Sequence, residues 1–152
     1  MRTLALLALL LSATGSVALA QEGLPEAKSD TEAGNLETFR LWSEEVWGNG
    51  RLELVPDLVA DEYVRHDADG TRVVTPEGYT QEIAQGRAVD LKFQMNAVSI
   101  DGNLLWTRWS ASFQIPGGEG AVLRGIQIYR FADAKLAETW LLTATDDDWP
   151  DN

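Results

Sequence analysis

The stretch that decides the fold is Leu123-Arg-Gly-Ile-Gln-Ile-Tyr-Arg-Phe-Ala-Asp-Ala-Lys-Leu-Ala-Glu-Thr-Trp140. β-Branched and aromatic residues occur at strand spacing up to Phe131, stop at Ala132-Asp133-Ala134, and resume from Leu136. This pattern predicts two strands joined by a tight turn, a β-hairpin.

Neither face of the first strand of this hairpin is fully polar. Ile126 and Ile128 lie on one face. Gly125, Gln127 and Tyr129 lie on the other. A strand of this kind is covered on both faces, either by a second layer or by an enclosed pocket. Because a buried amide needs hydrogen-bond partners from protein, water or a ligand, we expect Gln127 to face a cavity.

The first 20 residues are typical of a secretory signal peptide. Arg2 precedes the apolar run Leu4–Leu11, and small residues then lead to an Ala-x-Ala ending at Ala20. Ser12 interrupts the run well short of the ~20 apolar residues that a membrane span requires. We therefore expect cleavage after Ala20 and a periplasmic or secreted protein. Residues 21–33 are polar and aperiodic, which predicts a flexible linker.

The composition excludes several classes of protein. A chain of 152 residues is enough for one domain, and the absence of cysteine rules out disulfides, thiolate metal sites and a cysteine nucleophile. The net charge is −12 and becomes −13 when Arg2 leaves with the leader. Such an acidic surface repels phosphate backbones and anionic lipids, so we expect neither nucleic acid nor a membrane as partner. The acidic tail, residues 146–152, is predicted to be solvated.

Helical periodicity occupies the first half of the domain. The first predicted helix is Thr31–Trp47, which ends at Gly48-Asn49-Gly50. The second is Leu52–Val59, around Pro56. The third begins at Thr75-Pro76, and its Tyr79 and Ile83 are expected to face inward. Between the last two, residues 62–66 are predicted to be extended. Asp67-Ala68-Asp69-Gly70 is predicted to be a turn, because a calcium loop would need a glutamate where Gly78 stands.

After Gly86 the apolar period changes from 3.6 to 2. Phe93 and Met95 alternate with polar residues, Asp101-Gly102-Asn103 forms a hairpin turn, and a long strand spans residues 104–113. With the hairpin described above, this predicts a four-stranded antiparallel meander. The fold class is α+β, with three helices on one sheet face. If the sheet curls, we expect a cone that opens on the opposite side.

Five segments, in this order, resemble the SnoaL-like (polyketide cyclase-like) branch of the NTF2-like superfamily. They are Trp42-Ser-Glu-Glu-Val-Trp47, Leu58-Val-Ala-Asp-Glu-Tyr-Val-Arg-His66, Pro76-Glu-Gly78, Gly125-Ile-Gln-Ile-Tyr-Arg-Phe131 and Leu136-Ala-Glu-Thr-Trp140. The resemblance covers residues 36–143 and places the domain at 34–145. It implies a cone-shaped α+β barrel with a largely apolar pocket, no cofactor, and often a dimer formed through the sheet.

At Gln127 this sequence differs from the family that it resembles. In the polyketide cyclases of this branch the matching position is an aspartate that acts as general acid and base. A neutral amide cannot exchange a proton at ordinary pH, whereas it can donate a hydrogen bond to a carbonyl or accept one. The residue therefore favours binding over the cyclase chemistry of the family.

His66 and Glu138 are the candidate acid/base residues. His66 is the only histidine, which excludes a site with two histidine ligands and argues against a catalytic zinc. It is either an acid/base at the pocket mouth, with an ordinary pKa near 6.5, or a structural histidine bonded to the backbone or to Asp67. Glu138 shares a face with Trp140, and it either replaces the missing carboxylate or is exposed. We expect no metal site.

The remaining candidates would line the pocket. Tyr129 shares the face of Gln127, and Trp109 and Trp140 are either core residues or platforms for a ligand. Met95 fills the core or the pocket wall. No Gly-x-Ser-x-Gly elbow or phosphate-binding glycine loop is present, although one histidine would suffice for a Ser-His-Asp triad.

Three functions remain open at this point. The first is an exported domain that binds a small apolar organic molecule without the family's aspartate. The second is a cofactor-independent enzyme that performs isomerisation, cyclisation or hydration, with His66 or Glu138 as acid/base and Gln127 orienting a carbonyl. The third is a non-catalytic module for dimerisation or another interaction.

Overall fold

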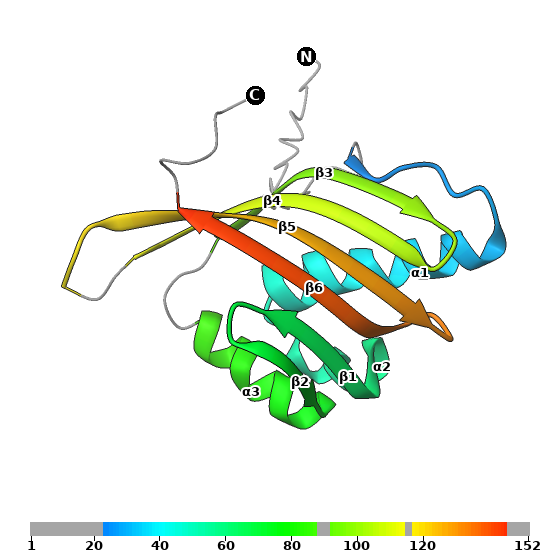
Figure 1. The fold of residues 1–152 in the computed structure, drawn as a ribbon, viewed down its shortest axis with the longest axis horizontal. Coiled ribbons are helices and arrows are strands. Elements are labelled where there is room, and N and C mark those ends of the chain that lie inside the picture. Colours follow the sequence, from blue (N-terminus) through cyan, green and yellow to red (C-terminus); the bar gives the residue numbers. More distant parts are fainter. Residues whose placement is uncertain (1–22, 88–91, 115–116, 146–152) are drawn as a thin grey trace, which may run out of the picture.

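The computed structural model describes residues 23–87, 92–114 and 117–145, in which a curved sheet carries its helices on one side (Figure 1). The predicted leader and the acidic tail lie outside these residues. The elements are α1 (Asp30–Arg40), η2 (Leu41–Gly48), η3 (Leu52–Leu54), α2 (Val55–Leu58), β1 (Val59–Asp67), β2 (Gly70–Val74), α3 (Pro76–Arg87), β3 (Lys92–Asp101), β4 (Leu104–Gln114), β5 (Gly120–Ala132) and β6 (Lys135–Thr145). None of the described helices is long and apolar enough to cross a membrane.

The sheet has six strands in the order β2-β1-β6-β5-β4-β3. The predicted antiparallel meander is confirmed for β3 to β6. The prediction missed the hairpin β1–β2, which extends the sheet because β1 pairs in parallel with β6. That pairing joins segments about 75 residues apart in sequence, so no local pattern reveals it.

The hairpin β5–β6 is confirmed, including its two-residue turn. Asp133 and Ala134 both have positive φ, 50° and 56°, as the twist-matched turns of two-residue hairpins require. Below the turn, Ile128 pairs with Trp140 and Tyr129 pairs with Thr139. This register decides which side chains face the helices.

Helix α1 begins at Asp30, earlier than predicted. The Ser29 hydroxyl accepts a hydrogen bond from the Glu32 N–H at 3.2 Å and caps the helix. Leu24 and Ala27 pack against the core. The prediction of a flexible linker over residues 21–33 is therefore wrong for residues 30–33, which form the first helical turn.

The segment η2 continues α1 as a π-helix. The Asn49 N–H donates to the Glu44 carbonyl, five residues back, at 2.9 Å. In a regular α-helix, residues five apart point about 140° away from each other. Here Trp42 and Trp47 meet edge to face with their ring centroids 6.2 Å apart. The wider turn thus brings both tryptophans to the side that faces the sheet.

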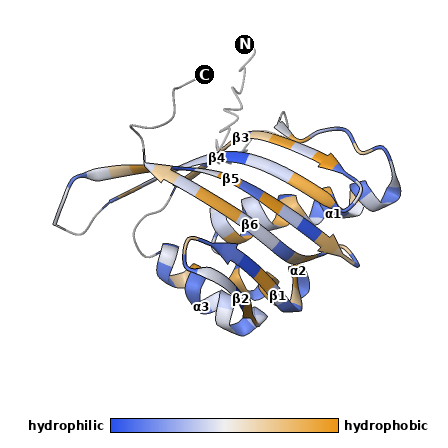
Figure 2. Ribbon diagram, in the orientation of Figure 1, coloured by the Kyte–Doolittle hydropathy of each residue, from blue (hydrophilic) through white to orange (hydrophobic). Residues whose placement is uncertain are grey.

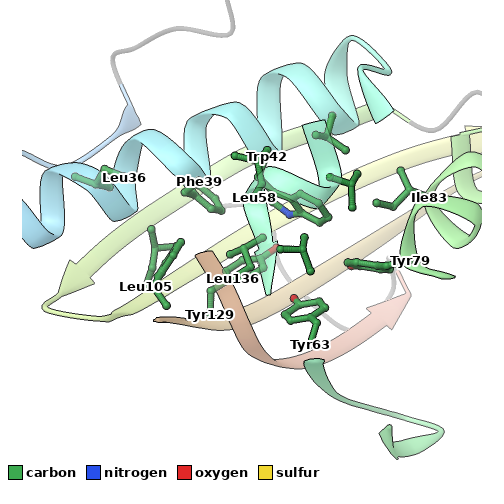
Figure 3. Close-up of a cluster of buried hydrophobic side chains, with 14 of the residues drawn as sticks. Leu36, Phe39, Trp42, Leu58, Tyr63, Tyr79, Ile83, Leu105, Tyr129 and Leu136 are labelled. Carbon is green, nitrogen blue, oxygen red and sulfur yellow. The ribbon is translucent and has the colours of Figure 1, made fainter. Parts of the chain in front are cut away.

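The core lies between the helices and the concave face of the sheet, as Figure 3 shows. Its fully buried side chains include Phe39, Trp42, Tyr63, Ile83, Leu105, Phe131 and Leu136. Hydrophobic and hydrophilic positions alternate along the strands (Figure 2), because successive residues point to opposite faces. Gln127, Tyr129 and Thr139 consequently face inward, whereas Ile126 and Trp140 face outward.

Gly125 allows the Trp109 indole to lie flat across the inner face of β5. The two residues are cross-strand partners, and a Cβ at Gly125 would overlap the six-membered ring of Trp109. A glycine in the middle of a strand often marks such a close approach. Trp109, which lies in the wall of the site described below, therefore depends on the missing side chain of Gly125.

Gly125→Ala should lower the free energy of unfolding by about 1–3 kcal/mol, because the added methyl displaces a buried ring. Urea unfolding measures this change. Gly34→Ala in α1 is the matched control, since its Cβ would meet Ala134 at an ordinary 3.8 Å and helices favour alanine. Equal stability of Gly125→Ala and wild type would show that Trp109 is not held in this position.

A buried carboxylate fastens α1 to the turn between β3 and β4. Glu32 accepts hydrogen bonds from the N–H of Gly102 at 2.9 Å and from the N–H of Lys28 at 2.6 Å. Asn35 donates to the Gly102 carbonyl at 3.1 Å. The Gly102 hydrogen bond, followed by that of Lys28, holds the pKa of Glu32 below its ordinary value of 4.5.

Because the pKa of Glu32 is lowered on folding, its contribution to stability is present above pH 4.5 and is lost as the pH falls through the folded-state pKa. Glu32→Gln should therefore flatten the decline in unfolding free energy below pH 4.5, measured by urea unfolding at a series of pH values. Glu62→Gln, at an exposed position of β1, should follow the wild type. Parallel pH profiles for wild type and Glu32→Gln would contradict this role.

Candidate functional site

A cavity of about 140 Å³ lies between the helices and the concave face of the sheet. It is lined by Phe39, Trp42, Ser43 and Trp47 from α1 and η2, Arg65 from β1, Tyr79 from α3, and Phe93, Met95, Trp109, Gln127, Tyr129 and Leu141 from the strands β3 to β6. The expected cone on the side opposite the helices is wrong. The sheet curves toward the helices, so its concave face and the cavity are on their side (Figure 1).

Aromatic rings form most of the cavity wall. Phe93 meets Trp47 and Trp109 edge to face, with centroid distances of 5.0 and 5.2 Å. Trp42 packs on Tyr79 at 5.5 Å, and the two residues approach each other from η2 and α3 in Figure 3. Rings in such contacts support one another, so the wall is fixed by packing between elements.

Gln127 contributes an oriented amide to this wall. Its side chain is 7% exposed, and its Nε2 donates to the Thr139 hydroxyl at 3.0 Å. That hydroxyl in turn donates to the Ile128 carbonyl at 2.9 Å. This chain of hydrogen bonds fixes the orientation of the amide, as a binding group requires.

Arg65 brings the only positive charge among the described lining residues. Its Nη1 donates to Glu82 at 2.7 Å, and its guanidinium lies 4.6 Å above the centre of the Tyr79 ring. The Nε of Arg65 and the Nε1 of Trp109 are both buried and have no hydrogen-bond partner. Both N–H groups are enclosed by protein and are not exposed to the free space of the cavity.

A more open hollow of about 400 Å³ adjoins the cavity and shares Trp47, Arg65, Tyr79 and Leu141 with it. Glu82 lies in this mouth, where one carboxylate oxygen accepts from Arg72 at 2.6 Å and the other from Arg65 at 2.7 Å. Both oxygens therefore bind arginine, and neither is directed at the cavity as a free base.

The cavity wall lacks a group that exchanges protons near neutral pH. Among the described lining residues there is no carboxylate and no histidine. Burial raises the pKa of the phenol groups of Tyr79 and Tyr129 above the ordinary value of 10, so both remain protonated. The described lining residues therefore offer an aromatic surface and hydrogen-bonding groups, and none of the common acid/base side chains, carboxylate or imidazole.

His66 and Glu138 lie together, but on the outer face of the sheet. The His66 Nε2 is 2.8 Å from the Glu138 carboxylate, its Nδ1 is 2.8 Å from the Thr71 hydroxyl, and its ring stacks on Trp140 at 5.2 Å. Arg130 also donates to Glu138 at 2.8 Å. The hydrogen bonds from His66 and then Arg130 lower the pKa of the Glu138 carboxyl.

The structure thus divides the predicted site residues between two faces. Gln127, Tyr129, Trp109 and Met95 line the cavity. Trp140, 37% exposed, and the candidate acid/base residues His66 and Glu138 lie outside it. The expectation that His66 or Glu138 acts beside Gln127 fails because β6 alternates, with Thr139 and Leu141 inside and residues 138 and 140 outside.

The sequence analysis missed Arg65 as a wall residue, although a signal was present. Tyr63 is a large aromatic residue in β1 and is fully buried. Since strand side chains alternate, a Tyr63 that points inward implies that Arg65 also points inward and that His66 points outward. Among the described residues, no group of three or more acids and histidines could hold a metal ion.

Solved structures with this architecture come from several bacteria. A candidate polyketide cyclase from Acidithiobacillus ferrooxidans superposes with a TM-score of 0.65 at 23% identity, covering 78% of this chain and 91% of that one. A candidate SnoaL-like polyketide cyclase from Jannaschia sp. CCS1 gives 0.66 at 15% identity, with the same coverage. A SnoaL-like polyketide cyclase from Agrobacterium tumefaciens gives 0.63 at 16%, covering 72% and 91%. These similarities show an NTF2-like fold.

No curated protein matches this sequence significantly. The profile of the SnoaL-like domain, however, matches residues 39–139, from the end of α1 into β6. This match includes every residue that lines the cavity except Leu141. The chain therefore belongs to the SnoaL-like domain family.

Proposed function

We propose that this protein binds a small, largely apolar organic molecule in the cavity and does not transform it. The observation that carries the proposal is a buried aromatic wall with one oriented amide, Gln127, and no described group that titrates near neutral pH. A pocket with mostly apolar walls and a few fixed polar groups is typical of small-molecule sites.

The size of the cavity limits the ligand. A volume of 140 Å³ is close to that of engineered apolar cavities, about 150 Å³, which hold a molecule such as benzene. The enclosed part therefore fits about one ring, and any further atoms of the ligand would extend through the mouth beside Arg65 and Tyr79.

The enzyme alternative is less well supported. By the resemblance, Gln127 takes the place of the aspartate of the polyketide cyclases, and an amide cannot replace its proton transfer. His66 and Glu138 face the other side of the sheet, so neither reaches a molecule beside Gln127. We further propose that binding occurs outside the cytoplasm, after removal of the leader over residues 1–20.

Toluene should bind in the cavity and change the tryptophan fluorescence, because Trp42, Trp47 and Trp109 line the wall. Ser43→Phe adds a ring to the enclosed space and should abolish this response. Ser43→Ala, which removes only a hydroxyl bonded to the Phe39 carbonyl at 2.9 Å, should keep it. Circular dichroism confirms that each variant is folded.

His66→Ala changes the outer face of the sheet and tests whether that face contributes to the toluene response. The response should be unchanged, because His66 does not line the cavity. A wild-type protein that does not respond to toluene near its solubility limit would contradict the proposal. Native mass spectrometry of the protein purified from its own host would then identify any natural ligand that co-purifies.

We also propose that two copies associate through the outer patch, which consists of Ile126, Ile128, Trp140 and Leu142. These residues are paired across β5 and β6, and Ile126 and Leu142 are 43% and 65% exposed. A contiguous exposed apolar surface on a sheet favours a protein contact. Arg108 pairs with Ile126 across β4 and β5, so a positive charge flanks the patch although the net charge of the chain is −12.

Leu142→Glu should shift the protein from the mass of two chains to that of one, measured by light scattering during size-exclusion chromatography, because the interface would bury an unpaired charge. Ala84→Glu, at an exposed position of α3 on the helix side, is the matched control and should leave the mass unchanged. A wild-type protein with the mass of one chain at micromolar concentration would contradict self-association.

A further inference from the structure

An open hollow of about 710 Å³ on the outer face of the sheet gathers positive charge. It is formed by β3, β4 and β5, and its basic lining residues are Lys92, Arg108 and Arg124. Arg108 pairs across the strands with Ile126 of the outer patch, which places the hollow on that face. None of the described lining residues is acidic, although acids outnumber bases by 24 to 12 in the whole chain. The hollow is thus a basic site on an acidic protein.

The strand register places hydroxyl groups between these cations. Ser110 pairs with Arg124 across β4 and β5, and Ser112 pairs with Lys92 across β3 and β4. Arg108 lies two residues before Ser110, so its side chain points to the same face. The side chains of Lys92, Arg108 and Ser112 are exposed, and both serines line the hollow. These groups therefore border free space that a ligand can enter.

A β-bulge adds an amide to the same hollow. The register of β3 shifts between Met95 and Ala97, so Asn96 is the extra residue and lines the hollow. Bulges redirect side chains and are frequent beside functional sites. The Nδ2 of Asn96 donates to the Ser110 hydroxyl at 3.3 Å. Because the Ser110 oxygen accepts this hydrogen bond, its O–H can be donated to a ligand.

Arg108 is a cation that no described carboxylate neutralises. It forms no ion pair with any residue of the described chain, whereas Lys92 and Arg124 also take part in other interactions, which a ligand would share. At physiological ionic strength, charges more than about 8 Å apart are largely screened, so a small anion responds to the nearby cations. An extended polyanion would also meet the acidic remainder of the surface.

We infer that this hollow binds a small soluble molecule that carries a phosphate group. Guanidinium groups bind phosphate through paired N–H donors, and hydroxyl groups supply further hydrogen bonds. The donors come from three neighbouring strands, so they approach from several directions. A tetrahedral phosphate presents oxygens in several directions, whereas the oxygens of a carboxylate lie in one plane. This site is separate from the aromatic cavity and does not depend on the binding function proposed for it.

Isothermal titration calorimetry with pyrophosphate tests the inference. Wild-type protein should bind one equivalent, and Arg108→Gln should bind about tenfold more weakly, because it loses hydrogen bonds between charged groups. Arg130→Gln is the matched control, since it removes the same charge from β5 outside the hollow lining. It should retain the wild-type affinity. Circular dichroism confirms that both variants are folded.

Two further measurements define the class of ligand. Citrate, a tricarboxylate, should bind at least threefold more weakly than pyrophosphate if the hollow recognises phosphate. The protein should remain in solution when vesicles of phosphatidylglycerol are sedimented, because its acidic surface is repelled by an anionic membrane. Co-sedimentation that Arg108→Gln abolishes would identify a lipid headgroup and overturn the soluble class.

Four other outcomes would overturn the inference. If pyrophosphate does not bind at millimolar concentration, the hollow is not a phosphate site. If citrate binds as tightly, phosphate is not the recognised group. If Arg108→Gln and Arg130→Gln lose the same affinity, the response reflects net charge alone. If pyrophosphate binds only to a variant that ends at Thr145, the acids of residues 146–152 exclude an external anion from the native chain.

Discussion

The pairing of β6 with β5 on one side and β1 on the other is the constraint on which the structure depends. Because strand side chains alternate, the partners Tyr129 and Thr139 fix an inner face, and the partners Ile128 and Trp140 fix an outer one. A shift by one residue would exchange the two faces completely. The sheet therefore keeps the oriented amide of Gln127 on one side and the titratable pair His66–Glu138 on the other.

The helices pack against the inner face of the sheet, and a cavity remains between the two layers. The π-helical turn η2 directs Trp42 and Trp47 toward the sheet, and these rings contact Tyr79 and Phe93, which belong to different elements. These rings are held by contacts between different elements, and a space of about one ring lies among them. On the opposite wall, Gly125 gives the Trp109 ring its place.

The distribution of charge around the cavity supports the proposed binding function. The acids nearest the cavity, Glu82 and Asp67, face the arginines of β1 and β2 in its mouth. The buried phenols remain protonated because burial raises their pKa. In the function proposed above, the aromatic surface of the wall would recognise the shape of a ligand, and the fixed amide of Gln127 would recognise its hydrogen-bonding groups.

The sequence by itself determined the α+β class, the β5–β6 hairpin, the shared face of Gln127 and Tyr129, and the family, because each follows from local periodicity, turn residues or ordered motifs. Only the tertiary structure decided two things. The parallel contact of β1 with β6 joins distant segments, and the direction of sheet curvature placed the cavity, and with it Gln127, on the side of the helices. Such features arise from long-range packing, which no local pattern encodes.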